Sequence, residues 1–138
     1  MTMAGDKPMT LFSMTERALS AQLVRMNTAT SNLANAGSVS RSAEEAYRPI
    51  RVRFASELDA ATGLASVRSD GLVRSSAEPT RRYDPGHPLA DADGNVWEAP
   101  VDETAEMVEI MESARQYQNL VQALTTAKQL MLETLRSN

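Results

Sequence analysis

The sequence has no cysteine among its 138 residues, and this absence removes several kinds of chemistry at once. Disulfide bonds, thiolate metal sites and thiol catalysis are all excluded. Aromatic side chains are also scarce, at 4% of the residues, whereas methionine occurs eight times. A single compact core built on two Phe, three Tyr and one Trp would be thin. We therefore expect Leu, Val and Met to supply the packing between helices.

The sequence also has no excess of basic residues, and its formal net charge is −4. This balance argues against a nucleic-acid-binding protein, which needs clustered Lys and Arg to displace counterions. The amino-terminal sequence has no positive cluster followed by an apolar run, so we expect no cleaved signal peptide of the Sec type. No stretch approaches the roughly 18 apolar residues of a transmembrane helix, which predicts that nothing spans a bilayer.

Signals for an active site are equally few. His87 is the sole histidine and has no partner for a catalytic triad or a metal site. The "DADG" segment at 91–94 resembles part of a calcium loop, but Leu89 and Pro100 occupy positions where that loop needs ligands. We interpret the segment as a plain turn. With no glycine-rich phosphate loop either, we predict no enzyme activity, no catalytic residues, no metal and no cofactor.

A row of acids at the start of the carboxyl-terminal region is the one remaining candidate for chemistry. Its members are Asp102, Glu103, Glu106, Glu109 and Glu112. Paired carboxylates can serve as acid and base, but no polar cluster elsewhere complements these. Acids at the beginning of a helix also complement the positive end of its dipole. We therefore interpret the row as a solvated helix face.

The amino-terminal region predicts one long amphipathic helix over residues 11–36. Four apolar side chains recur every seven residues, and Leu23 and Ala29 fill intermediate positions near the same face; the four are Phe12, Leu19, Met26 and Leu33. Gly37 follows directly and is expected to form a left-handed cap. Residues 38–46 are expected to form a flexible loop.

The carboxyl-terminal region carries a stronger helical signal. Spacings of three and four residues connect Met107, Ile110, Ala114, Tyr117, Val121, Leu124, Met131 and Leu135. Lys128 is the only interruption of this heptad pattern, which favours coiled-coil packing. Leu120, Leu130 and Leu132 lie off this seam, and exposed apolar faces of such length mark partner surfaces. A small self-contained helical bundle with a β arm is the alternative.

The middle of the chain predicts β structure. Ile50, Val52 and Phe54 alternate with arginines as in a half-buried strand, and "GLASVRSDGLVRSS" predicts two short strands around a hairpin turn at Asp70-Gly71. A further short strand is expected from Asn95 to Glu98. The predicted fold is mainly α, with two long terminal helices packing as a coiled coil around a small β-rich insert (α+β).

We accordingly divide the chain into four segments. Residues 1–10 form an amino-terminal extension, and residues 11–36 form the first helix. Residues 37–100 form the loop and the β-rich region, and residues 101–138 form the second helix.

Three segments together resemble a known family. "SNLANAGSVS" followed by "YRP", then "YDPGHPLADADGNV", then "MVEIMESARQYQNLVQALTTAKQLMLETL" are similar to the FlgC family of flagellar basal-body rod proteins. The resemblance covers the chain from about Ala18 to Leu135. Three features depart from the family: the longer start at 1–10, Asn119-Leu120 in place of Ala-Asn, and the loop "VSRSAEEA".

The resemblance implies a structural role in the bacterial flagellum. Such subunits are exported unfolded by the flagellar type III system and polymerise in the periplasm into the proximal rod, which is needed for motility. Their terminal helices form a coiled-coil layer of the tube. Implied partners are copies of the chain, other rod proteins and the membrane-ring and export-gate base, with no nucleic acid and no small-molecule substrate. Alternatives are another rod subunit, a chaperone-like helical module, or an enzyme.

On this basis we predict a set of subunit-interface residues on the two helices. They are Phe12, Leu19, Leu23, Met26, Asn32, Leu33, Asn35, Met107, Ile110, Ala114, Tyr117, Val121, Leu124, Met131 and Leu135. We expect the terminal helices to remain largely unfolded or frayed until neighbouring subunits cover these stripes.

Three asparagines in the first helix call for a separate explanation, because asparagine is a mediocre helix residue. Asn27, Ser31 and Asn35 share one face opposite the apolar stripe, where we expect them to contact only a neighbouring subunit and fix its axial register. Asn32 lies nearer the flank of the seam. The alternative at Asn35 is that its side chain merely helps to end the helix.

The loop over residues 83–96 is expected to stand off the helical layer as a rigid turn and to contact a neighbouring subunit. Pro85 and Pro88 fix two backbone angles in it, and we expect Gly86 and Gly94 to adopt turns that other residues resist.

Overall fold

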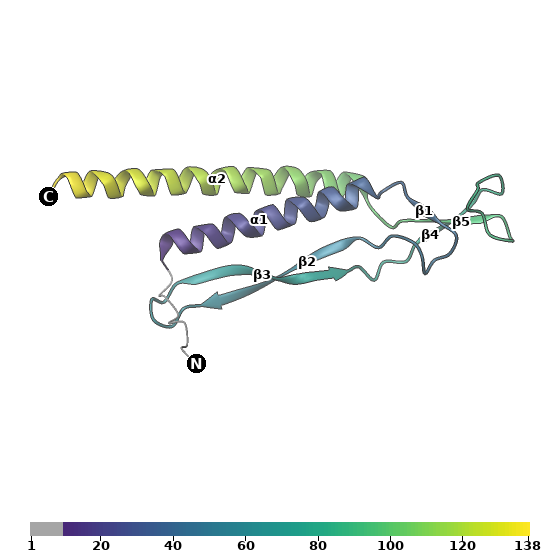
Figure 1. Ribbon diagram of the computed structural model, residues 1–138, viewed down its shortest axis with the longest axis horizontal. Helices are drawn as coiled ribbons and strands as arrows, with labels where there is room; N and C mark the ends of the chain where they lie inside the picture. Colours follow the sequence, from purple (N-terminus) through teal and green to yellow (C-terminus); the bar gives the residue numbers. More distant parts are fainter. Residues whose placement is uncertain (1–9) are drawn as a thin grey trace, which may run out of the picture.

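The computed structural model describes residues 10–138 and has two long helices with antiparallel strands between them (Figure 1). The elements, in chain order, are α1 (Leu11–Ala34), β1 (Val39–Ser40), β2 (Ile50–Leu58), β3 (Ala65–Arg74), β4 (Thr80–Tyr83), β5 (Asn95–Glu98) and α2 (Glu103–Arg136). The predicted α+β class and both terminal helices are confirmed. The expected extension at 1–10 lies outside the described residues except for Thr10.

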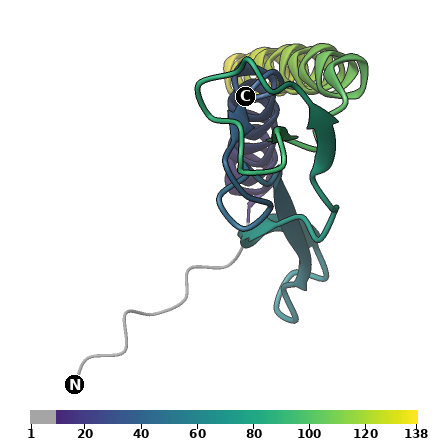
Figure 2. The ribbon, with the colours of Figure 1, turned by 90° about the vertical axis from the view of Figure 1, so that its right-hand side faces the viewer.

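The elements form three layers that run along the long axis of the molecule and stack across it (Figure 1). Helix α1 lies in the middle and contacts α2 on one side and the β2–β3 hairpin on the other. A second sheet, in the order β1-β5-β4, lies beyond the end at which α1 finishes and α2 begins. Figure 2, which views the molecule from that end, shows the loops of this second sheet in front of the helices.

Both helices begin at side-chain caps. Thr10 accepts a hydrogen bond from the backbone nitrogen of Ser13 (3.1 Å), and the Ser13 hydroxyl accepts one from the backbone nitrogen of Thr10 (2.9 Å). This reciprocal pair satisfies donors that the first turn of a helix leaves free. At α2 the Asp102 carboxylate accepts from the backbone nitrogen of Ala105 at 3.1 Å.

Asn35, rather than Gly37, ends α1. The Asn35 amide donates to the Ser31 carbonyl at 2.8 Å, and the Asn35 carbonyl accepts from the backbone nitrogen of Ser38 at 3.1 Å. Gly37 does not have a positive φ, so the predicted left-handed cap at this residue is wrong. The alternative that Asn35 helps to end the helix is confirmed.

The face of α2 that packs on α1 is shifted by one residue from the predicted heptad. Its most enclosed side chains follow alternating spacings of four and three: Glu106, Ile110, Ser113, Tyr117, Leu120, Leu124 and Ala127. Three predicted positions belong to this row, namely Ile110, Tyr117 and Leu124. Met107 and Val121 instead are 53% and 41% exposed, and Leu120, which was placed off the seam, is half-buried within it.

The interior of α1 consists of small and polar side chains. The buried residues are Thr15, Ala21, Thr28, Ala29 and Asn32. The predicted apolar stripe, Phe12, Leu19, Met26 and Leu33, is only half-buried, and Leu23 is exposed. Small side chains on both facing helices leave the larger apolar groups at the margins of the contact.

Helix α2 extends past the beginning of α1 (Figure 1). The two helices contain 24 and 34 residues, so at a rise of about 1.5 Å per residue α2 is longer by about 15 Å. Every residue from 128 to 138 is exposed. We call residues 128–136 the α2 overhang.

The β2–β3 hairpin turns over residues 59–64, not at Asp70-Gly71. There, the backbone nitrogen of Asp59 donates to the Leu64 carbonyl at 2.8 Å. Asp70 and Gly71 lie inside the single strand β3, where the register shift places both of them opposite Arg53. Gly71 has φ 113°, so this pair forms a β-bulge, and the predicted turn is wrong.

The second sheet confirms one predicted strand and adds two that sequence reasoning missed. The strand from Asn95 to Glu98 is β5, and it pairs with β4 on one side and β1 on the other. Val39 and Ser40 of β1 fall in the segment predicted to be a flexible loop. Val96, at the centre of β5, is completely buried.

The loop between β4 and β5 is closed by its own hydrogen bonds. The Asp91 carboxylate accepts from the backbone nitrogens of Asp93 and Asn95, both at 2.9 Å. Gly94 has φ 79°, and a β-carbon there would lie 2.9 Å from Cε2 of Tyr83. Gly86 has no positive φ and open space around it, so the expectation that this glycine is also required is wrong.

We predict that Gly94→Val destabilises the protein by about 1–3 kcal/mol, because it adds both backbone strain and a steric clash. Gly86→Val is the matched control and should change the free energy of unfolding by less than about 0.5 kcal/mol. Urea denaturation of both variants measures the difference. Equal destabilisation by the two substitutions would contradict the assignment.

Candidate assembly interface

Asn32 is a polar side chain of α1 whose amide nitrogen and amide oxygen both form hydrogen bonds to other parts of the chain. It is fully buried, and its amide nitrogen donates to the Ile50 carbonyl at 2.9 Å. Its amide oxygen accepts from the backbone nitrogen of Ile50 at 2.8 Å and from the Tyr47 hydroxyl at 2.9 Å. The side chain thus pairs with Ile50 as a neighbouring strand would, and it joins the last turns of α1 to the first residue of β2.

The asparagine hypothesis needs a corresponding correction. Asn27 is exposed, but the Ser31 hydroxyl lies 3.5 Å from the Tyr47 hydroxyl of the same chain. Ser31 and Asn35 both have partners within the chain, so the expectation that they serve only in a contact with a neighbouring subunit is wrong, and their role in fixing the register of a neighbour stays a prediction. Asn32, which we expected near the flank of the seam, instead fixes the position of α1 relative to β2 within the chain.

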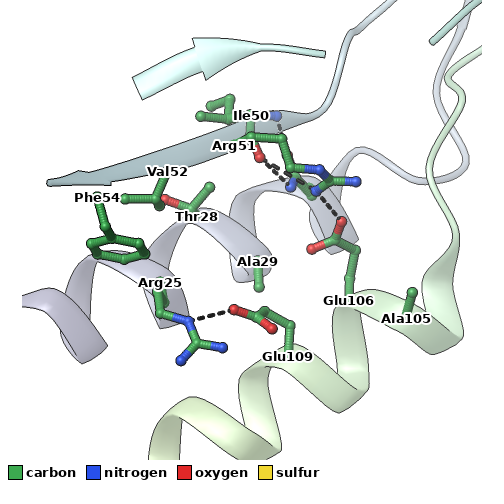
Figure 3. Close-up of a pocket in the computed structure, with 11 residues that line it drawn as sticks. Arg25, Thr28, Ala29, Ile50, Arg51, Val52, Phe54, Ala105, Glu106 and Glu109 are labelled. Atoms are coloured by element: carbon green, nitrogen blue, oxygen red, sulfur yellow. Dashed lines mark hydrogen bonds and ion pairs between the residues drawn. The ribbon is translucent and has the colours of Figure 1, made fainter. Parts of the chain in front are cut away.

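Two of the acids of α2 form ion pairs with other elements, as Figure 3 shows. Glu106 is 3% exposed and accepts from Nη1 of Arg51 on β2 at 2.6 Å. Glu109 accepts from Nε of Arg25 on α1 at 2.7 Å, and this hydrogen bond raises the pKa of Arg25 against the opposing effect of burial. The interpretation of these two acids as a solvated face is therefore wrong.

A pocket of about 300 Å³ lies where α1, β2 and α2 meet (Figure 3). Both ion pairs contribute to its wall, together with the apolar side chains of Val52 and Phe54. Because each acid is already paired with an arginine, the site neutralises its own charge and presents no free acid–base pair. It joins three elements instead of offering a reactive group.

Other candidate chemistry in the described part of the chain is equally structural. The His87 ring nitrogen Nδ1 accepts from the backbone nitrogen of Leu89 at 3.0 Å, within the loop between β4 and β5. Among residues 10–138 no group of His, Asp and Glu side chains is arranged to hold a metal ion. No helix in that range has the length and apolarity that crossing a membrane requires.

The predicted interface residues fall into two groups. Five are exposed: Leu23, Met107, Val121, Met131 and Leu135. The others are half-buried or, for Asn32, buried within the chain itself: Phe12, Leu19, Met26, Asn32, Leu33, Asn35, Ile110, Ala114, Tyr117 and Leu124. Sequence reasoning did not include Val108 and Met111, which are 54% and 64% exposed beside Met107.

An elongated helix pair with uncovered apolar side chains is suited to assembly, and the comparisons agree with this. Residues 14–39 match the family described as flagella basal body rod protein. Residues 92–137 match the carboxyl-terminal domain of the flagellar basal body rod FlgEFG proteins. The fold and these matches define the chain as a flagellar basal-body rod protein, a structural component of the flagellum.

Comparison with complete relatives identifies the family. The chain is 42% identical over 127 residues to the flagellar basal-body rod protein FlgC of Salmonella typhimurium, covering 91% of this chain and 93% of the relative. It is 39% identical to FlgC of Yersinia enterocolitica, with the same two coverages, and 31% identical to FlgC of Agrobacterium fabrum, covering 85% of each. The chain therefore belongs to the FlgC family, and the resemblance is confirmed.

We predict that Asn32→Ala lowers the free energy of unfolding by about 1–3 kcal/mol, because the backbone nitrogen of Ile50 loses its partner and the Ile50 carbonyl keeps only the longer hydrogen bond from Nη1 of Arg51, at 3.4 Å. Asn27→Ala, on the exposed face of the same helix, is the control and should stay within about 0.5 kcal/mol of the wild type. Chemical denaturation measures both. Asn32→Asp should also destabilise, because a carboxylate cannot donate to the Ile50 carbonyl. If Asn32→Ala lowered the free energy of unfolding no more than Asn27→Ala does, the hydrogen bonds of the Asn32 amide would not stabilise the fold.

Proposed function

We propose that the chain polymerises in the periplasm into the proximal rod of the flagellum, with its terminal helices in the wall of the tube. Two observations support this: membership of the FlgC family, and a second helix whose end is not covered by any other element among residues 10–138. The α2 overhang is the observation that carries the proposal, because the interior row of α2 continues there beyond α1.

The spacing of side chains along α2 makes this continuation specific. Met131 lies seven residues after Leu124, and Leu135 lies four residues further, so both lie close to the line of the α1-facing row. They are 45% and 68% exposed. Burying a fully exposed side chain of this size stabilises by about 1.5–3 kcal/mol. Because these two are about half exposed, a neighbour that covers both gains roughly half of that for each.

Leu130 and Leu132 show that other sides of the α2 overhang also carry exposed apolar side chains. They are 59% and 48% exposed and, at 100° per residue, project away from Met131 in different directions. One partner helix covers one stripe, whereas a tube surrounds a helix on several sides. We therefore propose coiled-coil contacts of the overhang with more than one neighbouring subunit, using the predicted interface residues.

The four segments then have distinct roles in the proposal. Residues 11–36 and 101–138 form the helical wall, and residues 37–100 face outward or contact neighbours through the loop between β4 and β5. Residues 1–10 keep no assigned role. Partners are other copies of the chain, other rod proteins and the membrane-ring and export-gate base, and no cofactor, nucleic acid, substrate or catalytic step is involved.

Export as an unfolded chain through the flagellar type III system, without a cleaved signal peptide, completes the proposal. The composition of the interior supports it, because among residues 10–138 the buried apolar residues, apart from Pro49 and Pro79, are Ala21, Ala29, Ala46, Val96 and Ala99. Such small side chains bury little area and contribute little to the free energy of unfolding. The absence of cysteine also leaves no disulfide to resist unfolding.

We predict that Met131→Asp abolishes rod assembly and motility in a strain that lacks the native chain, because it places an unpaired charge in a subunit contact. Export should continue at the wild-type level. Gln129→Asp introduces the same charge on a polar position of the overhang and should support assembly. Leu124→Asp is a poorer test, since Leu124 faces α1 of its own chain.

The measurement is the count of rods in purified basal bodies, with the amount of exported chain as the control. Normal rods containing the Met131→Asp chain would contradict the proposed contact. Loss of rods in both variants would show sensitivity to any added acid on the overhang and would also contradict a contact specific to its apolar side chains.

A further inference from the structure

Helix α2 carries two separate exposed apolar patches, one near each end. The head patch consists of Met107, Val108 and Met111, which are 53%, 54% and 64% exposed. The tail patch consists of Leu130, Met131, Leu132 and Leu135, with exposed fractions between 45% and 68%. Neither patch is covered by another described element of the chain.

The charges around the two patches have opposite signs. Residues 102–112 contain five acids and no base. Two of these acids, Glu106 and Glu109, are paired with arginines inside the chain, which leaves Asp102, Glu103 and Glu112 around the head patch. Arg115, one helical turn after Met111, is the one base beside them, so the head patch remains acidic. Residues 127–138 contain Lys128 and Arg136 against the single acid Glu133.

The helix dipole explains only part of this pattern. It favours acids in the first turn and bases in the last turn, and its effect falls off beyond them. Glu103 and Arg136 meet that rule, but Glu112 and Lys128 lie outside the terminal turns. The charges flanking both patches are therefore complementary beyond what one isolated helix requires.

We infer that the tail patch of one copy docks on the head patch of a second copy. The inference rests on the proposed function, because it specifies one contact through which copies of this chain polymerise. Contact between unlike patches places Lys128 and Arg136 near Glu103 and Glu112, whereas contact between like patches places equal charges together. Contacts between two different surfaces also propagate, which like-with-like contacts between two copies do not.

The absence of native cysteine allows a direct test. A chain carrying both Met111→Cys and Met131→Cys has one thiol in each patch and no other thiol. The two positions are 20 residues apart on one helix, or about 30 Å, so they cannot form a disulfide within one chain. Any disulfide therefore joins two copies.

The variants are expressed in a strain that lacks the native chain, and purified basal bodies are oxidised and run on a denaturing gel. The double variant should give a ladder of dimers, trimers and larger species. Each single variant should remain monomeric on the gel. A second double variant carries Val108→Cys and Leu135→Cys and should give the same ladder. It serves as the test if the first double variant does not assemble or if its two thiols do not meet.

Two results would overturn the inference. Dimers from a single variant would indicate contact between like patches. Rods that assemble normally but give no ladder with either pair would show that other surfaces cover the patches, and the proposed rod function would then stand without this contact. The proposed function itself would fail if the chain were absent from purified rods, which the same gel reveals.

Discussion

The pairing of the Asn32 amide with the backbone of Ile50 is the constraint on which the arrangement of layers depends. It fixes where β2 begins relative to the last turns of α1, and the hairpin follows from that point. Arg51, the next residue along β2, is thereby placed within reach of Glu106 on α2. A single buried amide thus orders helix, hairpin and second helix, and every polar atom it uses is satisfied.

This constraint explains why the interior can consist of small and polar side chains. Directional hydrogen bonds and ion pairs set the positions of the elements, so the contact between α1 and α2 does not need large apolar groups. The larger groups remain at the margins and on the α2 overhang. The chain is folded around specific polar contacts and leaves large apolar side chains exposed, which the proposed association with neighbouring subunits requires.

The sequence allowed prediction of what local periodicity determines. Both terminal helices, the strand from Asn95 to Glu98 and the family resemblance were predicted, because spacing, caps and motifs are read from neighbouring residues. The phase of the α2 face was wrong by one residue, since an acid at Glu106 looks solvated until Arg51, 55 positions earlier, is placed beside it. Asn32 and the bulge at Gly71 were missed for the same reason: each depends on a partner that the fold brings from a distant segment.

Hydrogen exchange along α2, in the monomer and in assembled rods, tests most directly whether the chain leaves part of this helix for its neighbours. Because α1 packs along α2 within the chain, our account limits the fraying expected for both terminal helices to the overhang. It predicts slow exchange from about Glu106 to Leu124 in the monomer, where α1 covers the helix, and fast exchange over residues 128–136. On assembly the overhang should become as protected as the rest of α2. Uniform protection in a demonstrated monomer, or an overhang that still exchanges rapidly in the rod, would contradict the account.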